Sequence, residues 1–282
     1  PLLPQIIEDL STKATEEELK EAFTDEWGVK YSKDGRKLLK APQELKGCYS
    51  VKEGTRMICD EVFWYSCSLS NIVIPGSVTS IGNWAFKGCT SLSNIVIPNS
   101  VTSIGDWAFS DCTSLSNIVI PNSVTSIGEG AFSSCTSLSN IVIPDSVTRI
   151  GNLAFSNCTS LSNIVISYSV TNIGDDVFYQ CSSLTSVVIP NSVTCVGDEA
   201  FCKCRSLSNI VIPNSVTSIG VSVFWGCSSL VNMDIPDSVT RIGDWAFVNC
   251  SNLSYDLKQE LISRFGDELF KLPLHFPAFL KS

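Results

Sequence analysis

Residues 92–113 have the sequence LSNIVIPNSVTSIGDWAFSDCT, and a version of this stretch recurs every 23 residues over about two-thirds of the chain. A phenylalanine keeps the same spacing from Phe63 to Phe247, and a glycine keeps it from Gly82 to Gly243. A fixed period of this length is typical of solenoids, in which each copy forms one coil that packs only on its neighbours. The leucine that opens the copies recurs without insertion or deletion at Leu69, Leu92, Leu115, Leu138, Leu161, Leu184, Leu207, Leu230 and Leu253.

The length and charge of the chain limit the classes of protein to which it can belong. It has 282 residues and a formal net charge of −9, whereas a nucleic-acid partner would normally require a basic face. No apolar run approaches the roughly 18 residues that a membrane span needs. Because the sequence starts at Pro1, we expect a trimmed or mature form whose signal peptide is not visible. We therefore expect neither a nucleic-acid partner nor a membrane span.

Each copy contains a short strand with distinct inward and outward side chains. In residues 92–98, Ile95 and Ile97 alternate with Val96, which predicts inward isoleucines and an outward valine. Stacked copies of this strand predict a parallel sheet, and Pro98 ends the strand because proline lacks an amide hydrogen. The sheet is therefore expected to have a buried isoleucine face and an outer valine face.

The rest of each copy is expected to close the coil around an apolar centre. Residues 101–104 form a second extended segment, Gly105 supplies a corner, and residues 108–109 are expected on a turn of tight helix. Burying one large apolar side chain contributes roughly 1.5–3 kcal/mol, so a coil outweighs its ordering entropy only when neighbours stack. The predicted inward positions are Leu92, Ile95, Ile97, Val101, Ile104, Ala108, Phe109 and Cys112.

Eight of the 13 cysteines occupy one fixed repeat position. Side chains one coil apart would lie about 4.8 Å from each other and point the same way, which suits disulfide geometry poorly. We therefore interpret the cysteines of this column as small buried apolar residues. Free thiols fit a reducing compartment and do not exclude an oxidising one. The column consists of Cys89, Cys112, Cys135, Cys158, Cys181, Cys204, Cys227 and Cys250.

Segments outside the repeat are expected to cover the apolar ends of the solenoid. We divide the chain into an N-terminal cap at residues 1–45, about nine coils at 46–253, and a C-terminal cap at 254–282. In the first cap, glutamates in the opening turn predict a short helix over residues 15–23. The Asp-Gly pair within residues 29–39 predicts a hairpin there.

The second cap is expected to contain an amphipathic helix from Tyr255 to Phe270. Apolar side chains recur every four residues on one face of this helix, at Leu257, Leu261, Phe265 and Leu269. The apolar tail over residues 272–280 is interrupted by prolines, so we expect extended chain packed on the helix.

The order L-x-x-I-x-I-P-x-S-V-T-x-I-G-x-x-A-F-x-x-C-x-x resembles the BspA-like leucine-rich repeat, a 23-residue class found in bacterial surface proteins and some protozoa. The resemblance covers about residues 46–253, and departures such as Ser167 in place of a proline leave the fold intact. It implies an α/β repeat solenoid, a right-handed coil with a parallel sheet, flanked by a helix-and-hairpin cap and a helical cap. It also implies export and a role in adhesion, and it brings no catalytic motif.

The outward valines are the strongest candidate for a binding surface. If exposed, they form an apolar stripe roughly 30–40 Å long at strand spacing, which is larger than a monomer usually leaves uncovered. Such a stripe suits a protein partner or an extended peptide, although valine is also simply a good strand former. The stripe comprises Val73, Val96, Val119, Val142, Val165, Val188 and Val211, and the asparagines that border it are Asn71, Asn94, Asn117, Asn140, Asn163 and Asn209.

A second, weaker candidate is an aromatic patch. Trp84 and Trp107 share one repeat position in adjoining copies and could stack on sugar rings or on protein. Trp245 holds the same position farther along, but the copies between carry other residues, so the set is broken.

Candidates for catalysis are few. The only histidine is His275, in the proline-interrupted tail, so a histidine-activated nucleophile would have to be assembled there. Asp175-Asp176 and Asp198-Glu199 lie one coil apart and could bind a divalent cation, but a solvated acidic face is the simpler interpretation. We therefore expect no cofactor, no metal and no enzymatic activity.

Three functions remain to be weighed. The leading hypothesis is a non-enzymatic, monomeric interaction protein, secreted or attached to the cell surface, whose sheet face binds an extracellular-matrix or cell-surface protein. The alternative is a structural spacer that binds nothing along its faces. A third hypothesis, that the protein is an enzyme, depends on the histidine and the acidic pairs. Glutamates in the valine stripe would abolish binding in the first case and change nothing in the second.

Overall fold

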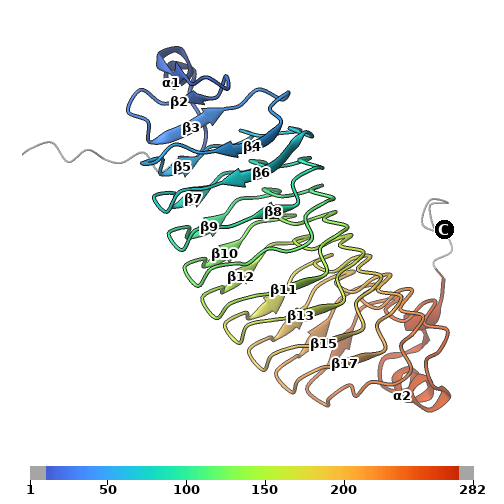
Figure 1. The fold of residues 1–282 in the computed structure, drawn as a ribbon. Coiled ribbons are helices and arrows are strands. Elements are labelled where there is room, and N and C mark those ends of the chain that lie inside the picture. The colour runs from blue at the N-terminus through green and yellow to red at the C-terminus, as the bar shows by residue number, and fades with distance from the viewer. Residues whose placement is uncertain (1–10, 273–282) are drawn as a thin grey trace, which may run out of the picture.

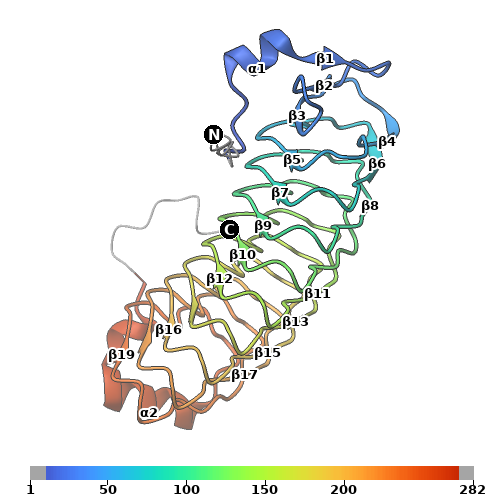
Figure 2. The same ribbon diagram turned by 90° about the vertical axis from the view of Figure 1, so that its left-hand side faces the viewer.

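The computed structural model describes residues 11–272, which form a curved stack of coils (Figure 1). Each coil has three sides. The N-I-V-I segments form what we name the valine side, the V-T-x-I segments the threonine side, and the A-F-x-x-C segments the turn side. Figure 2 shows the strands of the valine side and of the threonine side as two separate columns along the stack.

Strands of the valine side pair in parallel with a shift of one repeat, so that Asn140 lies opposite Asn163 and Val142 opposite Val165. They form three short sheets, β4-β6-β8, β11-β13 and β15-β17. The strands are β4 (Gly47–Ser50), β6 (Leu69–Val73), β8 (Asn94–Ile95), β11 (Asn140–Val142), β13 (Asn163–Val165), β15 (Ser186–Val188) and β17 (Asn209–Val211).

Strands of the threonine side follow the same parallel register, with Ile104 opposite Ile127 and Ile127 opposite Ile150. On this side the threonines are exposed, and most of their hydroxyls donate to the carbonyl of the threonine one coil earlier, as from Thr125 to Thr102 at 3.3 Å. The strands are β5 (Met57–Ile58), β7 (Ser80–Ile81), β9 (Ser103–Ile104), β10 (Ser126–Ile127), β12 (Arg149–Ile150), β14 (Asn172–Ile173), β16 (Cys195–Val196), β18 (Ser218–Ile219) and β19 (Arg241–Ile242).

The turn side contains no helix between residues 23 and 254, so the expected turn of tight helix is wrong. Its backbone adopts a left-handed conformation at two positions four residues apart in each coil, with φ of 53° at Trp84 and 74° at Gly88. The amide of Phe86 consequently donates to the carbonyl of Ala108 in the next coil at 2.8 Å. Bonds within the turn, such as that from the Lys87 amide to the Trp84 carbonyl at 3.1 Å, alternate with these bonds between coils, so the backbone of this side satisfies its polar groups in both ways.

The centre of the stack is a column of parallel phenylalanine rings. Successive centroids from Phe63 to Phe247 lie 5.1–5.9 Å apart, and every one of these rings is buried. All eight predicted inward positions of the copy that begins at Leu92 are also buried, which confirms that prediction. The main core is thus a continuous cluster that grows by the addition of coils, and Cys202, Trp225 and Val248 form a small second cluster.

The cysteine column is buried beside the phenylalanines. All 13 cysteines are free, and each thiol of the column donates to the carbonyl of a phenylalanine one coil earlier, as from Cys112 to Phe86 at 3.2 Å. Burial raises the pKa of the Cys89, Cys158 and Cys250 thiols to about 12. The column therefore consists of neutral thiols that pack as small apolar residues and satisfy an extra carbonyl.

Alkylation of the folded chain is expected to stop at the exposed thiols Cys48, Cys67 and Cys195. In the unfolded chain a cysteine thiol has a pKa of about 8.5. As the pH rises from there toward 12, the column thiols lose their protons in the unfolded state but keep them in the folded state, so the free energy of unfolding falls over that range. Mass spectrometry after brief iodoacetamide treatment, together with urea unfolding at neutral and alkaline pH, measures both effects. Modification of column thiols as fast as of exposed ones would show that the column is open.

The N-terminal cap joins the threonine side directly. Its elements are α1 (Glu16–Glu21), β1 (Phe23–Thr24), β2 (Lys30–Tyr31) and β3 (Lys37–Lys40). The hairpin is confirmed, since β2 and β3 are antiparallel, and β3 then pairs in parallel with β5. The helix is shorter than expected because Phe23 lies in β1, where its ring stacks on Tyr31 at 5.6 Å.

The C-terminal cap comprises α2 (Tyr255–Phe265) and the 3₁₀ helix η1 (Asp267–Phe270). The expected single helix is interrupted at Gly266, whose φ of 90° suits glycine. This break lets Phe270 stack on Phe247 at 5.9 Å, so the ring column ends inside the cap. Arg264 fixes α2 by donating to the carbonyls of Ile235 and Pro236. Leu272 is exposed, and the rest of the expected extended tail lies outside the described residues, as does His275.

Candidate functional site

The valine side carries the predicted stripe, and its valines are exposed. Their exposed fractions run from 51% at Val73 to 78% at Val96, whereas the aliphatic residues on either side of each valine are buried. The exposed valines of the stripe are Val73, Val96, Val119, Val142, Val165, Val188 and Val211, and the asparagines at positions 71, 94, 117, 140, 163 and 209 are exposed along one border.

Polar residues bound the stripe at both ends. Ser50 lies opposite Val73 in the paired strands β4 and β6, so it takes the valine position one coil earlier. Asp234 follows Val211 by one repeat and is exposed. The apolar surface therefore has a defined length and does not extend over the whole stack.

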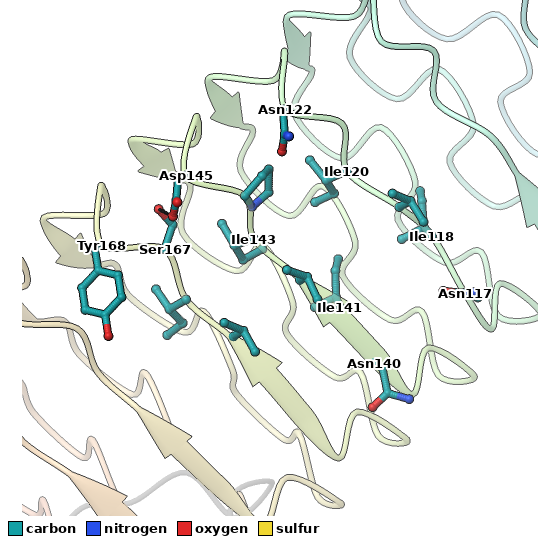
Figure 3. A pocket seen from close by; sticks show the side chains of 15 residues that line it. Asn117, Ile118, Ile120, Asn122, Asn140, Ile141, Ile143, Asp145, Ser167 and Tyr168 are labelled. Carbon is teal, nitrogen blue, oxygen red and sulfur yellow. Dashed lines mark hydrogen bonds between the residues drawn. The ribbon is translucent and has the colours of Figure 1, made fainter.

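A hollow of 520 Å³ lies near the middle of the stripe, across three coils (Figure 3). Asn117 and Asn140 lie at one edge of it, and Asn122, Asp145 and Tyr168 lie at the other. The valine-side sheet is interrupted here, because only a single bridge at Asn117 continues from β8. The hollow is half open to solvent and mainly apolar, so it offers an apolar recess on the valine side.

Tyr168 is a residue of this hollow that the sequence analysis missed. Its side chain is 73% exposed at a position where most other copies carry asparagine or aspartate. The preceding Ser167 replaces the usual proline, and its buried hydroxyl bonds to the carboxylate of Asp145 at 3.2 Å. The loss of the P-x-S pattern at residues 167–168 is the feature of the sequence that could have indicated Tyr168. An exposed tyrosine beside an apolar hollow is the kind of residue that anchors protein interfaces.

The predicted aromatic residues Trp84 and Trp107 lie on the turn side, away from the valine stripe. Both are half-buried, and the ammonium of Lys87 lies 5.3 Å from the centroid of the Trp107 ring. Trp84 and Lys87 also line a second, smaller pocket together with Trp64 and Tyr65 of the preceding coil. The two predicted residues therefore have different surroundings: Trp107 takes part in a cation–π contact, and Trp84 lines a pocket.

The acidic residues Asp175 and Asp198 have a structural role that the sequence analysis did not foresee. The Asp175 carboxylate accepts the amide of Asp198 at 2.9 Å, and that of Asp198 accepts the amide of Val221 at 2.7 Å. Burial raises the pKa of Asp176 and Glu199, and neighbouring carboxylates raise it further. Within residues 11–272, no group of three or more His, Cys, Asp or Glu side chains is arranged to hold a metal ion.

Residues 56–185 and 171–272 match the family model of the BspA type leucine rich repeat region, in 6 copies. These residues make up more than half of the chain, so the chain belongs to the BspA-type leucine-rich repeat family. Leucine-rich repeat proteins of this kind are typically non-enzymatic and point to a protein-interaction module. Within the described residues, no helix is both long and apolar enough to cross a membrane.

Solved structures show the same fold. A leucine-rich repeat protein from Eubacterium ventriosum is 24% identical with a TM-score of 0.58, over 81% of this chain and 67% of that one. The T. pallidum leucine rich repeat protein is 25% identical with a TM-score of 0.51, over 89% and 95%.

A leucine rich cell surface protein from Faecalibacterium prausnitzii is 32% identical with a TM-score of 0.47, over 80% of this chain. The chain spans 64% of the length of that protein. No curated protein matches the chain.

Proposed function

We propose that this chain is an adhesin-type interaction protein, secreted or displayed on the cell surface, that binds an extracellular-matrix or cell-surface protein through its valine side. The observation that carries this proposal is the run of seven exposed valines with a hollow at its centre. BspA-type repeat proteins are typically bacterial surface proteins, which supports the proposed location.

The shape of the valine side suits a folded or extended protein segment better than a small ligand. The stripe crosses seven coils, whereas the hollow covers three of them and is half open. Protein interfaces have a desolvated apolar centre and a polar rim, and the valines with their asparagine border have the same arrangement. Tyr168, at the edge of the hollow, supplies the aromatic anchor that such centres favour.

Replacing Val119, Val142 and Val165 together with glutamate is expected to weaken binding at least about 100-fold. Three desolvated carboxylates would oppose association, and interface centres tolerate charge poorly. Binding is measured by surface plasmon resonance on a panel of matrix proteins and by flow cytometry on whole cells.

A matched control carries glutamate at Thr125, Thr148 and Thr171, which lie exposed on the threonine side of the same coils. It adds the same charge, and we expect it to bind like the parent once circular dichroism shows that both variants fold. Equal binding by parent and valine variant would overturn the placement on the valine side. A parent that binds nothing on the panel would favour the spacer function.

A further inference from the structure

A second group of aromatic side chains lies on the turn side of the first two coils, apart from the valine side. Trp64 and Tyr65 are 43% and 44% exposed, and their rings meet edge to face with centroids 4.8 Å apart. Trp84, one coil later, is half-buried and lies beside them in the same pocket. Three aromatic side chains therefore line one exposed pocket.

The backbone of these coils is arranged to hold the rings in place. Tyr65 has a φ of 54°, and its amide donates to the carbonyl of Lys87 at 2.7 Å. A Cβ on Gly88 would lie 2.6 Å from the Tyr65 ring, so glycine at this position leaves room for it. Most later coils carry aspartate, serine, asparagine, glutamine or lysine where Gly88 stands. A second aromatic group, Tyr179, Trp225 and Trp245, lies in later coils, but there Trp225 is buried, whereas Trp64 and Tyr65 are exposed.

The pocket has a volume of 300 Å³ and is lined by Glu61, Trp64, Tyr65, Trp84 and Lys87. This size lies at the lower end of the range for small-molecule sites, roughly 300–1,000 Å³, and suits a ligand about the size of one or two rings. Its walls combine aromatic surface with one carboxylate and one ammonium. Such a lining can cover the apolar face of a ring while its polar groups take hydrogen bonds at the edge.

The charges of the pocket decide between ligand classes. An anionic ligand such as a phosphate would meet the exposed carboxylate of Glu61, and a quaternary ammonium would meet the ammonium of Lys87. Lys87 Nζ lies 3.9 Å from the carboxylate of Asp111, so its charge is already balanced in part. A neutral ligand with several hydroxyl groups avoids both repulsions. Its hydroxyls can donate to Glu61 and accept from Lys87.

We propose that this pocket binds a neutral sugar ring of an exposed glycan. The C–H face of a pyranose packs on the aromatic faces, which are electron-rich, and its hydroxyl edge reaches Glu61 and Lys87. The pocket shares no residue with the hollow of the valine side. Glycan binding and protein binding would therefore be separate properties of one chain.

The test is binding of the full chain to an array of neutral oligosaccharides that contain glucose, galactose, mannose or N-acetylglucosamine. Sialylated glycans and choline are included as charged comparisons. Binding of the sugar that the array identifies is then measured by saturation-transfer NMR for the variants Trp64→Ala, Trp84→Ala and Glu61→Gln. Each tryptophan variant is expected to bind about tenfold more weakly. Trp64→Tyr, which keeps a ring, should retain most of the affinity.

Trp27→Ala is the matched control, because this tryptophan is 54% exposed and does not line the pocket. It should bind like the parent, and all variants should keep the parental melting temperature. The proposal is overturned if no neutral glycan binds, if choline or sialylated glycans bind in preference, or if the pocket variants bind like the control. The valine-to-glutamate variant should retain glycan binding, which separates this site from the proposed protein interface.

Discussion

Replacing Phe155 with alanine is expected to lower the free energy of unfolding by about 3–5 kcal/mol. The ring is fully buried, and its centroid lies 5.6 Å from that of Phe132 and 5.9 Å from that of Phe178. Alanine would remove the apolar contacts of the ring and leave a cavity between two coils. Because the stack has only nearest-neighbour contacts, the cavity would also interrupt the coupling between its two halves.

Urea or thermal unfolding monitored by circular dichroism measures this effect. Val142→Ala is the control, since it removes methyl groups from an exposed position of a nearby coil and should change stability by less than about 0.5 kcal/mol. A melting curve of Phe155→Ala that matches the parent would contradict the placement of the phenylalanine column. Two separate unfolding transitions would support the loss of coupling between the halves.

Gly151→Ala is expected to destabilise the chain by about 3 kcal/mol, although it adds a single methyl group. A Cβ at this corner would lie 2.5 Å from the backbone nitrogen of Glu129 in the preceding coil, and 2.6 Å from the carbonyl carbon of Gly128. These neighbours are backbone atoms, so the two coils would have to move apart. Glycine is needed here for close approach between coils, since its φ is not positive.

Gly76→Ala is the matched control for this prediction. Gly76 has open space around the Cβ position and no positive φ, so alanine should be neutral or stabilise by up to about 1 kcal/mol. Chemical unfolding of both variants gives the comparison. Equal stability of Gly151→Ala and the parent would show that the coils can separate at this corner without cost.

The inward columns could be predicted from the sequence because every coil gives a residue the same neighbours. Phe109 and Cys112 lie in the core, as the repeat indicates, and Val96 lies outside for the same reason. Strand alternation and a strict period are sufficient for both conclusions. The exposure of the stripe, which is the basis of the proposed interface, was therefore predictable.

The turn side could not be predicted in the same way. Its left-handed backbone at Trp84 depends on hydrogen bonds to the next coil, which an isolated copy does not show. The carboxylate of Asp198 is an acceptor for the next coil, although in the sequence it indicates only an acidic patch. Phe270 continues the ring column because Gly266 ends α2, whereas four-residue spacing predicts one longer helix.

The missed candidate residues share a further property: they stand where the repeat pattern fails. Tyr168 belongs to the copy that lacks its proline, and Trp64 and Tyr65 belong to the first, atypical coil. The consensus of the repeat contains the residues that all copies need for packing. It gives no information on residues that occur in a single copy. Departures from the consensus, rather than the consensus itself, are where specific binding residues are expected in such arrays.

The most direct test of the valine side as the binding face is photo-cross-linking from single positions. A photoreactive phenylalanine analogue replaces Val142 in one variant and Thr148 in another; both positions are exposed, on the valine side and the threonine side respectively. After irradiation on target cells, covalent adducts are identified by mass spectrometry. We expect adducts with a cell-surface or matrix protein from position 142 and none from position 148. Adducts from position 148 alone would contradict the proposed interface.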